Sequence, residues 1–224
     1  MYLTRAEDGD LPAVFEASHA RIGSRSMRAF DVIAALALLL FLAPLMLLVA
    51  LAITIFDPGP VIFRHQRIGF DGRSFYCLKF RTMVVDAERR LQDLLTRSPE
   101  ARAEWALNQK LGSDPRITAL GRFLRKSSLD ELPQLFNILS GEMSLVGPRP
   151  IVHSEVHRYG RYFCHYVSVR PGLTGLWQVS GRNDTSYRTR VAMDVVYARQ
   201  QTLALNVLIL AKTVPAVVLA KGCS

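Results

Sequence analysis

A run of 25 residues without a charged side chain, 32–56, constrains this 224-residue chain more than any other feature. Thr54 is its only hydroxyl-bearing residue. As a straight α-helix the run would extend roughly 37 Å, at about 1.5 Å per residue, which exceeds the roughly 30 Å of a bilayer's hydrocarbon core. A signal peptide is disfavoured because the run is too long, lies well inside the chain and ends without a small-residue cleavage site. We therefore interpret it as a membrane segment.

Two observations favour a segment that enters and leaves the membrane by the same face. Pro44 lies in the middle of the run, where it removes a backbone hydrogen bond and kinks or breaks a helix. Cations flank both ends, namely Arg21, Arg25 and Arg28 before the run and Arg64, Arg67, Arg73, Lys79 and Arg81 after it. The positive-inside rule therefore draws both ends toward the cytoplasm. A re-entrant helix-break-helix over 28–56 fits both observations, and an ordinary spanning helix with a tolerated proline is the alternative.

The net charge and the cysteines narrow the class of protein only coarsely. A formal net charge of +9 attracts anions, which include nucleic acid, acidic lipid headgroups and phosphorylated substrates. The three cysteines, Cys77, Cys164 and Cys223, form no CxxC pair, so neither a disulfide framework nor a zinc knuckle is favoured. We therefore expect the part of the chain outside the membrane to lie in a reducing compartment.

The chain divides into a tail, a membrane segment and one further domain. Residues 1–27 have no sustained apolar period, which indicates a loosely ordered tail. Residues 57–224 are expected to form a single domain that includes a C-terminal helix over 203–220. That helix is apolar but interrupted by polar residues and a proline, so it fits either an interface-lying helix or one packed on the core.

The pattern within this domain predicts an α+β fold that is mainly helical. Asp71-Gly72 suits the left-handed positions of a tight turn, and the apolar stretches 61–63 and 75–78 flank it, which predicts a small β-hairpin. Two helices are expected after the hairpin, over 86–95 and from 98 to about 111.

The segment 122–134 brings three cations close to two adjacent carboxylates, Asp130 and Glu131; the cations are Arg122, Arg125 and Lys126. A purely structural explanation is a capping box, because Ser128-x-x-Glu131 matches the pattern that satisfies amides at a helix start. Pro133 weakens this explanation, since a helix capped at Ser128 would hold the proline at its fifth position and lose a hydrogen bond. A cap at Asp130 or later places the proline in the first turn.

With that later cap, the carboxylates of Asp130 and Glu131 sit at the positive end of the helix. The free amides and the macrodipole there favour an ionised aspartate, which is a competent nucleophile. Neighbouring side chains on a helix point about 100° apart, so one carboxylate can face a phosphorus atom while the other holds a metal ion.

Other residues are candidates for binding phosphate. Arg149 lies in Gly147-Pro148-Arg149-Pro150, where the prolines stiffen the loop and hold the guanidinium ready for bidentate phosphate binding. Lys79 and Arg81 are two residues apart on the second hairpin strand, so they are expected to project from the same face as a phosphate clamp. Basic residues on a strand are otherwise commonly just solvated, and Asp194 on its expected helix would by itself be a surface charge.

Several kinds of site are poorly supported. His153 and His157 have i, i+4 spacing, but no HExxH pattern or nearby cysteine completes a zinc site. The chain contains no GxxxxGK[ST] loop and no GxSxG elbow, which argues against a P-loop nucleotidase and a serine hydrolase.

Four segments together closely resemble the bacterial sugar transferases that initiate exopolysaccharide and O-antigen assembly, the monotopic polyprenyl-phosphate phosphoglycosyl transferases. They are Lys-Phe-Arg-Thr-Met at 79–83, Leu-Arg-Lys-Ser-Ser-Leu-Asp-Glu-Leu-Pro-Gln at 124–134, Gly-Glu-Met-Ser-Leu-Val-Gly-Pro-Arg-Pro at 141–150 and Arg-Pro-Gly-Leu-Thr-Gly at 170–175. The resemblance covers nearly everything from Arg28 to Lys221. Trp-Gln-Val-Ser-Gly-Arg-Asn at 177–183 makes the short galactosyl-phosphate transferase type of rhizobial exopolysaccharide synthesis the most similar.

This resemblance implies a covalent mechanism at the cytoplasmic face of the bacterial inner membrane. Asp130 would attack the sugar-bearing phosphate of a UDP-sugar, expel UMP and pass the phosphosugar to undecaprenyl phosphate. Mg²⁺ near Glu131 would neutralise the diphosphate, and four cations would spread the developing charge; they are Lys79, Arg81, Arg125 and Arg149. Asp194 matches another acidic position of the family's active site.

The resemblance also implies a re-entrant anchor among inner-membrane lipids, although Ala43-Pro44 stands where small members often have Ser-Pro. Galactose and glucose are the sugars it suggests, and the oligomeric state is open, a homodimer included. A catalytically lapsed membrane platform for polysaccharide assembly is the first alternative, against which intact Asp130 and Glu131 argue. A membrane-tethered nucleic-acid binder is the second, but its cations should cluster with exposed aromatics rather than around carboxylates.

Overall fold

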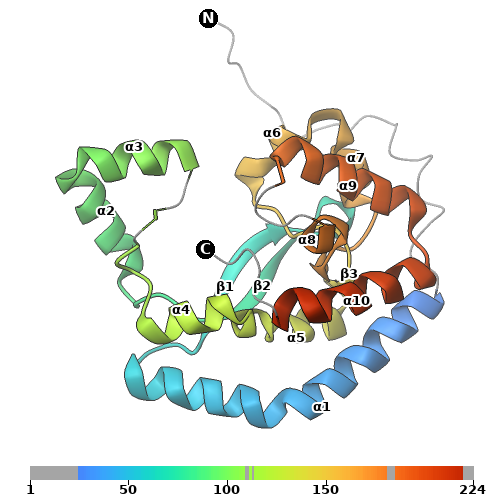
Figure 1. Cartoon of the computed structure of the whole chain (residues 1–224), viewed down its shortest axis with the longest axis horizontal. Helices are drawn as coiled ribbons and strands as arrows, with labels where there is room; N and C mark the ends of the chain where they lie inside the picture. The colour runs from blue at the N-terminus through green and yellow to red at the C-terminus, as the bar shows by residue number, and fades with distance from the viewer. Residues whose placement is uncertain (1–24, 109–110, 113, 181–184, 219–224) are drawn as a thin grey trace, which may run out of the picture.

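The computed structural model describes residues 25–108, 111–112, 114–180 and 185–218. Within these residues the fold is mainly helical, with two small two-stranded sheets (Figure 1). The α-helices are α1 (Arg25–Phe56), α2 (Ala87–Arg97), α3 (Pro99–Asn108), α4 (Ala119–Lys126), α5 (Gln134–Ser140), α6 (Val156–Tyr159), α7 (Phe163–Val167), α8 (Leu176–Ser180), α9 (Tyr187–Gln200) and α10 (Leu203–Val218). The strands are β1 (Ile62–Ile68), β2 (Ser74–Phe80), β3 (Ser144–Val146) and β4 (Gly172–Thr174), and the 3₁₀ turns are η2 (Phe70–Gly72), η3 (Leu129–Glu131), η4 (His153–Glu155) and η5 (Gly160–Tyr162). The expected mainly helical fold is confirmed.

The apolar run forms α1, which continues as one helix through Pro44. The expected interruption at this proline is corrected, because the helix bends instead of breaking: Figure 1 shows α1 changing direction as it passes beneath the other elements. Pro44 still lacks its own N–H, which removes one bond from the helical ladder and makes bending easier. By length and composition α1 can cross a membrane, and only 11% of its most apolar window is buried, so it is not the core helix of a soluble protein.

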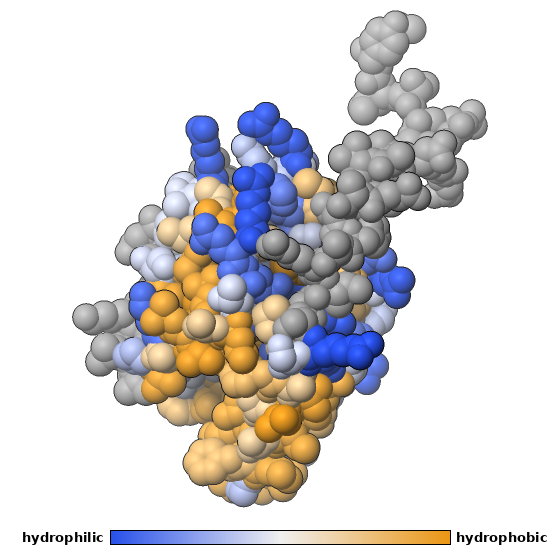
Figure 2. Space-filling view, turned by 90° about the vertical axis from the view of Figure 1, so that its right-hand side faces the viewer, coloured by the Kyte–Doolittle hydropathy of each residue, from blue (hydrophilic) through white to orange (hydrophobic). Residues whose placement is uncertain are grey.

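Hydrophobic residues gather over the lower end of the molecule, where Figure 1 places α1, while hydrophilic residues gather at the upper end (Figure 2). Large apolar side chains of α1 are freely accessible; Leu40 is 71%, Phe41 80% and Phe56 77% exposed. A contiguous apolar surface of this kind marks a membrane or protein contact. This surface supports membrane association of α1.

The hairpin forms as predicted, with β1 antiparallel to β2. Asp71 and Gly72 both adopt left-handed backbone conformations, with φ of 58° and 72°. This turn fixes the strand register, and directly opposed residues of an antiparallel pair point to the same face. One face of the hairpin therefore presents three opposed pairs, Arg67 with Phe75, His65 with Cys77 and Phe63 with Lys79.

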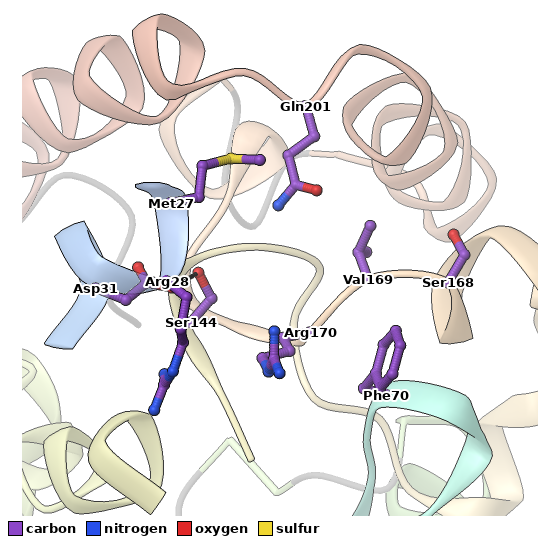
Figure 3. A pocket seen from close by; sticks show the side chains of 9 residues that line it. All are labelled: Met27, Arg28, Asp31, Phe70, Ser144, Ser168, Val169, Arg170 and Gln201. Carbon is purple, nitrogen blue, oxygen red and sulfur yellow. Dashed lines mark hydrogen bonds between the residues drawn. The ribbon is translucent and has the colours of Figure 1, made fainter. Parts of the chain in front are cut away.

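The N-terminal end of α1 is fastened to the body through polar contacts (Figure 3). Arg28 donates hydrogen bonds to the carbonyls of Ile138 at 2.7 Å and Leu139 at 3.1 Å, near the end of α5. Asp31 is 5% exposed and accepts hydrogen bonds from the Ser144 hydroxyl at 2.7 Å and from the backbone N–H of residue 145 at 3.1 Å. Further along α1, Ala35 and Ile53 are buried in the hydrophobic core. The mostly exposed helix α1 thus contributes a few side chains to the core.

The C-terminal helix α10 combines both interpretations that the sequence left open. Asn206 and Ile209 are buried against the body, and the Tyr197 hydroxyl donates a hydrogen bond to Asn206 at 2.9 Å. The outer side of the helix exposes apolar residues such as Leu208 and Val214. The two helices expected after the hairpin are also confirmed as α2 and α3, which extend away from the body in Figure 1.

Candidate active site

The two adjacent carboxylates lie in the short turn η3, between α4 and α5. Ser128, just before this turn, has a φ of 58°, an unfavourable left-handed conformation for a residue with a Cβ atom. Its side chain makes no capping hydrogen bond, so the capping box is absent, and α5 begins only at Gln134. Asp130 and Glu131 therefore precede α5 in a separate turn instead of occupying its first turn.

Lys79 of β2 reaches both carboxylates. Its Nζ atom donates a 2.6 Å hydrogen bond to Oε1 of Glu131 and lies 4.0 Å from Oδ2 of Asp130. The hairpin register explains this contact, because it turns Lys79 toward the face that covers η3. Lys79 thus lies beside the carboxylate pair, and its role in binding phosphate stays a prediction.

The two carboxylates have opposite pKa shifts. Burial raises the pKa of Asp130 to about 6, and the neighbouring Glu131 adds to this effect while Lys79 opposes it. The pKa of Glu131 is lowered, since the attraction of Lys79 and Arg149 outweighs the effect of burial. The sequence-based expectation that helix amides hold Asp130 firmly ionised is therefore corrected. Asp130 is a weakly solvated carboxylate that is still mostly ionised at neutral pH.

A cavity with an empty volume of about 310 Å³, partly open to solvent, adjoins the carboxylate pair. The predicted residues Lys79, Glu131 and Arg149 all line it, together with Arg67, Gln134 and Gln178. Arg149 is exposed, and the adjacent Pro150 carbonyl accepts a 3.1 Å hydrogen bond from Arg67. Three cations around one carboxylate form a surface that suits a diphosphate.

Arg125 approaches the site from α4. Its Nε atom donates a 2.8 Å hydrogen bond to the Thr82 hydroxyl, and its positive charge lowers the pKa of Asp130 against the dominant effect of burial. The close approach of α4 requires a glycine at position 121, where a Cβ atom would lie only 2.0 Å from the Thr82 carbonyl oxygen. The charge of Arg125 therefore acts on Asp130, and its predicted role in binding substrate stays a prediction.

Arg81 lies apart from this arrangement. Strand β2 ends at Phe80, so the alternation of side chains does not carry Arg81 to the face of Lys79. Its guanidinium is buried, donates a hydrogen bond to the Asp57 carbonyl and lies 3.5 Å from the Asp57 carboxylate, just after α1. The expected clamp of Lys79 and Arg81 is thus not seen, and Arg81 connects the hairpin to the end of the membrane helix.

Asp194 also lies outside the cavity. It is 2% exposed and accepts a 2.7 Å hydrogen bond from the Tyr159 hydroxyl, within a cluster of aromatic rings that includes Tyr166 and Tyr187. Burial raises the pKa of Asp194 to about 7, against the opposing effect of the Tyr159 hydrogen bond. The reading of Asp194 as a surface charge is wrong, and its role in substrate binding stays a prediction.

Three cavity residues were not singled out from the sequence, namely Arg67, Gln134 and Gln178. Arg67 could have been found by extending the hairpin register from Asp71-Gly72, which places it on the same face as Lys79. The two glutamines lie in segments quoted for the resemblance, 124–134 and 177–183, but nothing in their spacing assigns them to the cavity, because their positions depend on how α5 and α8 pack against the hairpin.

The carboxylate pair suits a magnesium site completed by substrate and water better than a metal site built from protein side chains alone. Among the described residues, no group of three or more His, Cys, Asp or Glu side chains is arranged to hold a metal. Mg²⁺ commonly needs only one or two carboxylates, with water and substrate phosphates completing its coordination. Glu131 would supply one such carboxylate, with substrate phosphates and water completing the coordination.

Comparison with known proteins agrees with this geometry. A family model described as bacterial sugar transferase matches residues 22–220. The exopolysaccharide production protein ExoY of Rhizobium meliloti is 50% identical over 90% of this chain and 89% of its own length. The undecaprenyl-phosphate galactose phosphotransferase of Salmonella typhimurium is 51% identical over 87% of this chain but only 41% of its own length. The undecaprenyl-phosphate glucose phosphotransferase of Komagataeibacter xylinus is 43% identical over 84% of this chain and 35% of its own length. This chain belongs to the bacterial sugar transferase family.

Proposed function

We propose that this enzyme transfers a hexose 1-phosphate from a UDP-sugar to undecaprenyl phosphate, releasing UMP. The observation that carries the proposal is the buried Asp130 beside Glu131 and Lys79, at a cavity lined by further cations. Family membership supports the same reaction, since two relatives are named as undecaprenyl-phosphate sugar phosphotransferases.

The transfer proceeds in two displacements at one phosphorus atom. A carboxylate oxygen of Asp130 attacks the phosphorus that bears the sugar, and the bond to the UMP oxygen breaks with its electron pair on UMP. An oxygen of undecaprenyl phosphate then attacks the aspartyl phosphosugar, and the carboxylate leaves. Both steps exchange one phosphorus–oxygen bond for another, so neither needs a redox partner or a net proton transfer.

The surroundings of Asp130 suit this role. Burial leaves its carboxylate poorly solvated, and less solvent must be displaced when it approaches an electrophile. Lys79, Arg67 and Arg149 lie where the negative charge of the diphosphate and of the leaving UMP must be stabilised. Arg125 approaches Asp130 from the other side and favours its ionised form.

Mg²⁺ is the cofactor that we assign to Glu131 and the substrate phosphates. When bound it would neutralise diphosphate charge and so reduce repulsion between the donor and the attacking carboxylate. Glu131 remains ionised because its pKa is lowered, which keeps it available as a ligand once Lys79 turns to the phosphates.

The lipid acceptor explains the position of the apolar helix. A polyprenyl chain stays in the bilayer, so the carboxylates must work close to the membrane surface. We place α1 in the bacterial inner membrane as a bent, re-entrant anchor, with the body at the cytoplasmic face, where nucleotide sugars are available. The exposed apolar residues Phe123 of α4 and Phe136 of α5 extend the lipid-facing surface toward the site.

Galactose and glucose are the expected sugars, because they are the ones named in the relatives. We assign the reaction to the first step of exopolysaccharide or O-antigen synthesis, an assignment that the similarity to a protein of exopolysaccharide production supports.

UMP release by the detergent-solubilised full chain tests the proposal, with undecaprenyl phosphate, Mg²⁺ and a panel of UDP-sugars. Wild type should release UMP from at least one donor, whereas Asp130→Asn and omission of Mg²⁺ should each stop turnover. A wild-type protein that binds lipid yet releases no UMP from any donor would support the lapsed-platform alternative.

A further inference from the structure

Two buried amide side chains one turn apart on α5 have opposite surroundings. Asn137 is 2% exposed, and both its amide nitrogen and its amide oxygen are hydrogen-bonded within the protein. Its nitrogen donates to the Tyr76 carbonyl at 2.8 Å and to Glu142 at 2.7 Å, and its oxygen accepts from the Leu78 backbone N–H at 2.9 Å. Asn137 therefore ties α5 to the hairpin. Gln134 is 3% exposed, but its amide makes no hydrogen bond with any residue that the structure describes.

The amide of Gln134, which has no hydrogen-bond partner among the described residues, lines the cavity next to Glu131. Its polar atoms are not among the fully buried atoms that lack a partner, so they are accessible from the cavity. An amide held in this way can form hydrogen bonds with a ligand without giving up an internal one. The position of Gln134 at the cavity wall thus points to a partner that arrives with the substrate.

Gln178 on α8 gives an independent indication from another element. It lines the same cavity, and its Oε1 atom is buried without a hydrogen-bond partner among the described residues. Its Nε2 atom makes only a long 3.4 Å contact with the carbonyl of Leu173, another cavity residue. Two neutral amides with unused hydrogen-bonding capacity therefore line a cavity whose other polar side chains are charged.

We infer that Gln134, assisted by Gln178, binds the hydroxyl groups of the transferred hexose and determines which sugar is accepted. Neutral amides cannot balance phosphate charge, whereas they both donate to and accept from hydroxyls. Gln134 follows Glu131 by three residues and lines the cavity beside it, so it lies next to the phosphorus that carries the sugar. The uridine leaves with UMP on the opposite side of that phosphorus. This inference rests on the proposed transferase function.

The test measures kcat/KM of the full-length protein for UDP-galactose, UDP-glucose and UDP-N-acetylglucosamine. Gln134→Met keeps the side-chain size and removes the amide. We expect about a tenfold fall in the ratio of kcat/KM between the preferred donor and the next, because one matched hydrogen bond is lost. Gln178→Met should lower the same ratio by a smaller factor. Thermal unfolding of Gln134→Met should occur near the wild-type temperature, since no internal hydrogen bond is lost.

Asn137→Leu is the matched control, because it removes a buried amide of the same helix whose hydrogen bonds are all internal. We expect it to lower the unfolding temperature and to leave the ratio between donors unchanged. Opposite behaviour of the two variants distinguishes a ligand-binding amide from a structural one.

An unchanged donor ratio in Gln134→Met would overturn the inference. If that variant instead altered the choice between UDP-glucose and ADP-glucose, the amide of Gln134 would bind the nucleobase of the donor. The assignment of the amide to the sugar would then be wrong. If wild type released no UMP from any donor, the proposed function would fail, and binding of labelled UDP-galactose would then decide the role of the amide. Equal affinity of wild type and Gln134→Met would overturn it in that case too.

Discussion

Asp130 and Asp194 are both buried aspartates, with 8% and 2% exposure, and burial raises the pKa of each, to about 6 and about 7. Their partners differ. Asp130 lies 4.0 Å from the ammonium group of Lys79, next to a second carboxylate and a cavity, whereas Asp194 has a neutral phenol, Tyr159, at 2.7 Å among packed rings. The two aspartates therefore share a side chain and a similar loss of solvation, but their surroundings differ. Those of Asp130 are charged and adjoin a cavity, whereas those of Asp194 are neutral and closely packed.

The comparison teaches that a raised pKa alone does not identify a reacting group. Burial weakens the solvation of both carboxylates, but only Asp130 has a cation 4.0 Å away and a neighbour, Glu131, that lines a cavity where a phosphorylated ligand can approach. Asp194 is enclosed, so its raised pKa has consequences for stability. Changes to the two regions should therefore separate activity from stability.

The largest effect should follow Asp130→Asn, which removes the attacking oxygen and keeps the shape of the side chain. We expect turnover to fall by at least about 1,000-fold, because the covalent intermediate cannot form. The measurement is UMP release, with the unfolding temperature as the control for folding. A loss of less than about tenfold would contradict the assignment of Asp130 as the reacting carboxylate, since Asp130 would then matter no more for turnover than the enclosed Asp194.

Lys79→Met should have the next largest effect. Removing a preorganised cation from a developing negative charge typically costs about 100-fold or more in turnover. Arg73→Met is a suitable control, because Arg73 is an exposed cation at the tip of the same hairpin, and it should leave turnover unchanged. Similar losses in both variants would show that the hairpin needs positive charge in general instead of the ammonium of Lys79.

The pH dependence of activity should report the pKa of Asp130. Since the carboxylate must be ionised to attack, kcat/KM should rise with pH up to a midpoint near 6 and fall about tenfold per pH unit below it. A pH series of initial rates with saturating lipid checks this expectation. A midpoint near the ordinary aspartate value of 3.8 would indicate that Asp130 is better solvated than the structure shows.

The smallest effect on turnover should come from Asp194→Asn, within a few-fold of wild type. Its effect should appear in stability. The folded-state pKa of Asp194 lies above its unfolded value, so this residue favours folding fully below about pH 4, and its contribution is lost as the pH rises to about 7. The free energy of unfolding of Asp194→Asn should therefore decline less than that of wild type over this range, by an amount on the order of a few kcal/mol.

Tyr159→Phe provides the matched variant for this stability measurement. Removing the hydroxyl leaves the ionised carboxylate without its hydrogen bond, so the pKa of Asp194 should rise above about 7 and the loss of stability should extend to higher pH. Denaturant unfolding at several pH values measures both variants. A loss of turnover in Asp194→Asn as large as that in Asp130→Asn would instead assign both aspartates to the reaction.

Local patterns predicted much of this molecule. The Asp71-Gly72 turn identified the hairpin because its backbone requirement is set by two residues, and the 25-residue apolar run identified α1 because nothing in it is charged. The turn η3 was singled out through the density of charge around Asp130 and through resemblance. In each case the relevant information lay within a short segment.

Features that depend on packing between distant segments were missed or misjudged. Arg81 is two residues from Lys79, yet the strand ends between them and the guanidinium turns to Asp57 at the end of α1. The burial of Asp194 depends on Tyr159, which lies 35 residues away in the chain. The continuity of α1 through Pro44 was also not predicted, and it accompanies contacts of the body with both halves of the helix, through residues such as Arg28 and Ile53.

The fastening of α1 to the body has a practical consequence for anyone who wants a water-soluble fragment. Cutting the chain after residue 56 would remove Arg28 from the carbonyls near the end of α5 and would remove Asp31 from Ser144. The fragment would then contain unsatisfied polar groups and a core without Ala35 and Ile53. Solubility is better sought by replacing the exposed apolar side chains of α1, such as Leu40 and Phe41, while its inward-facing residues are kept.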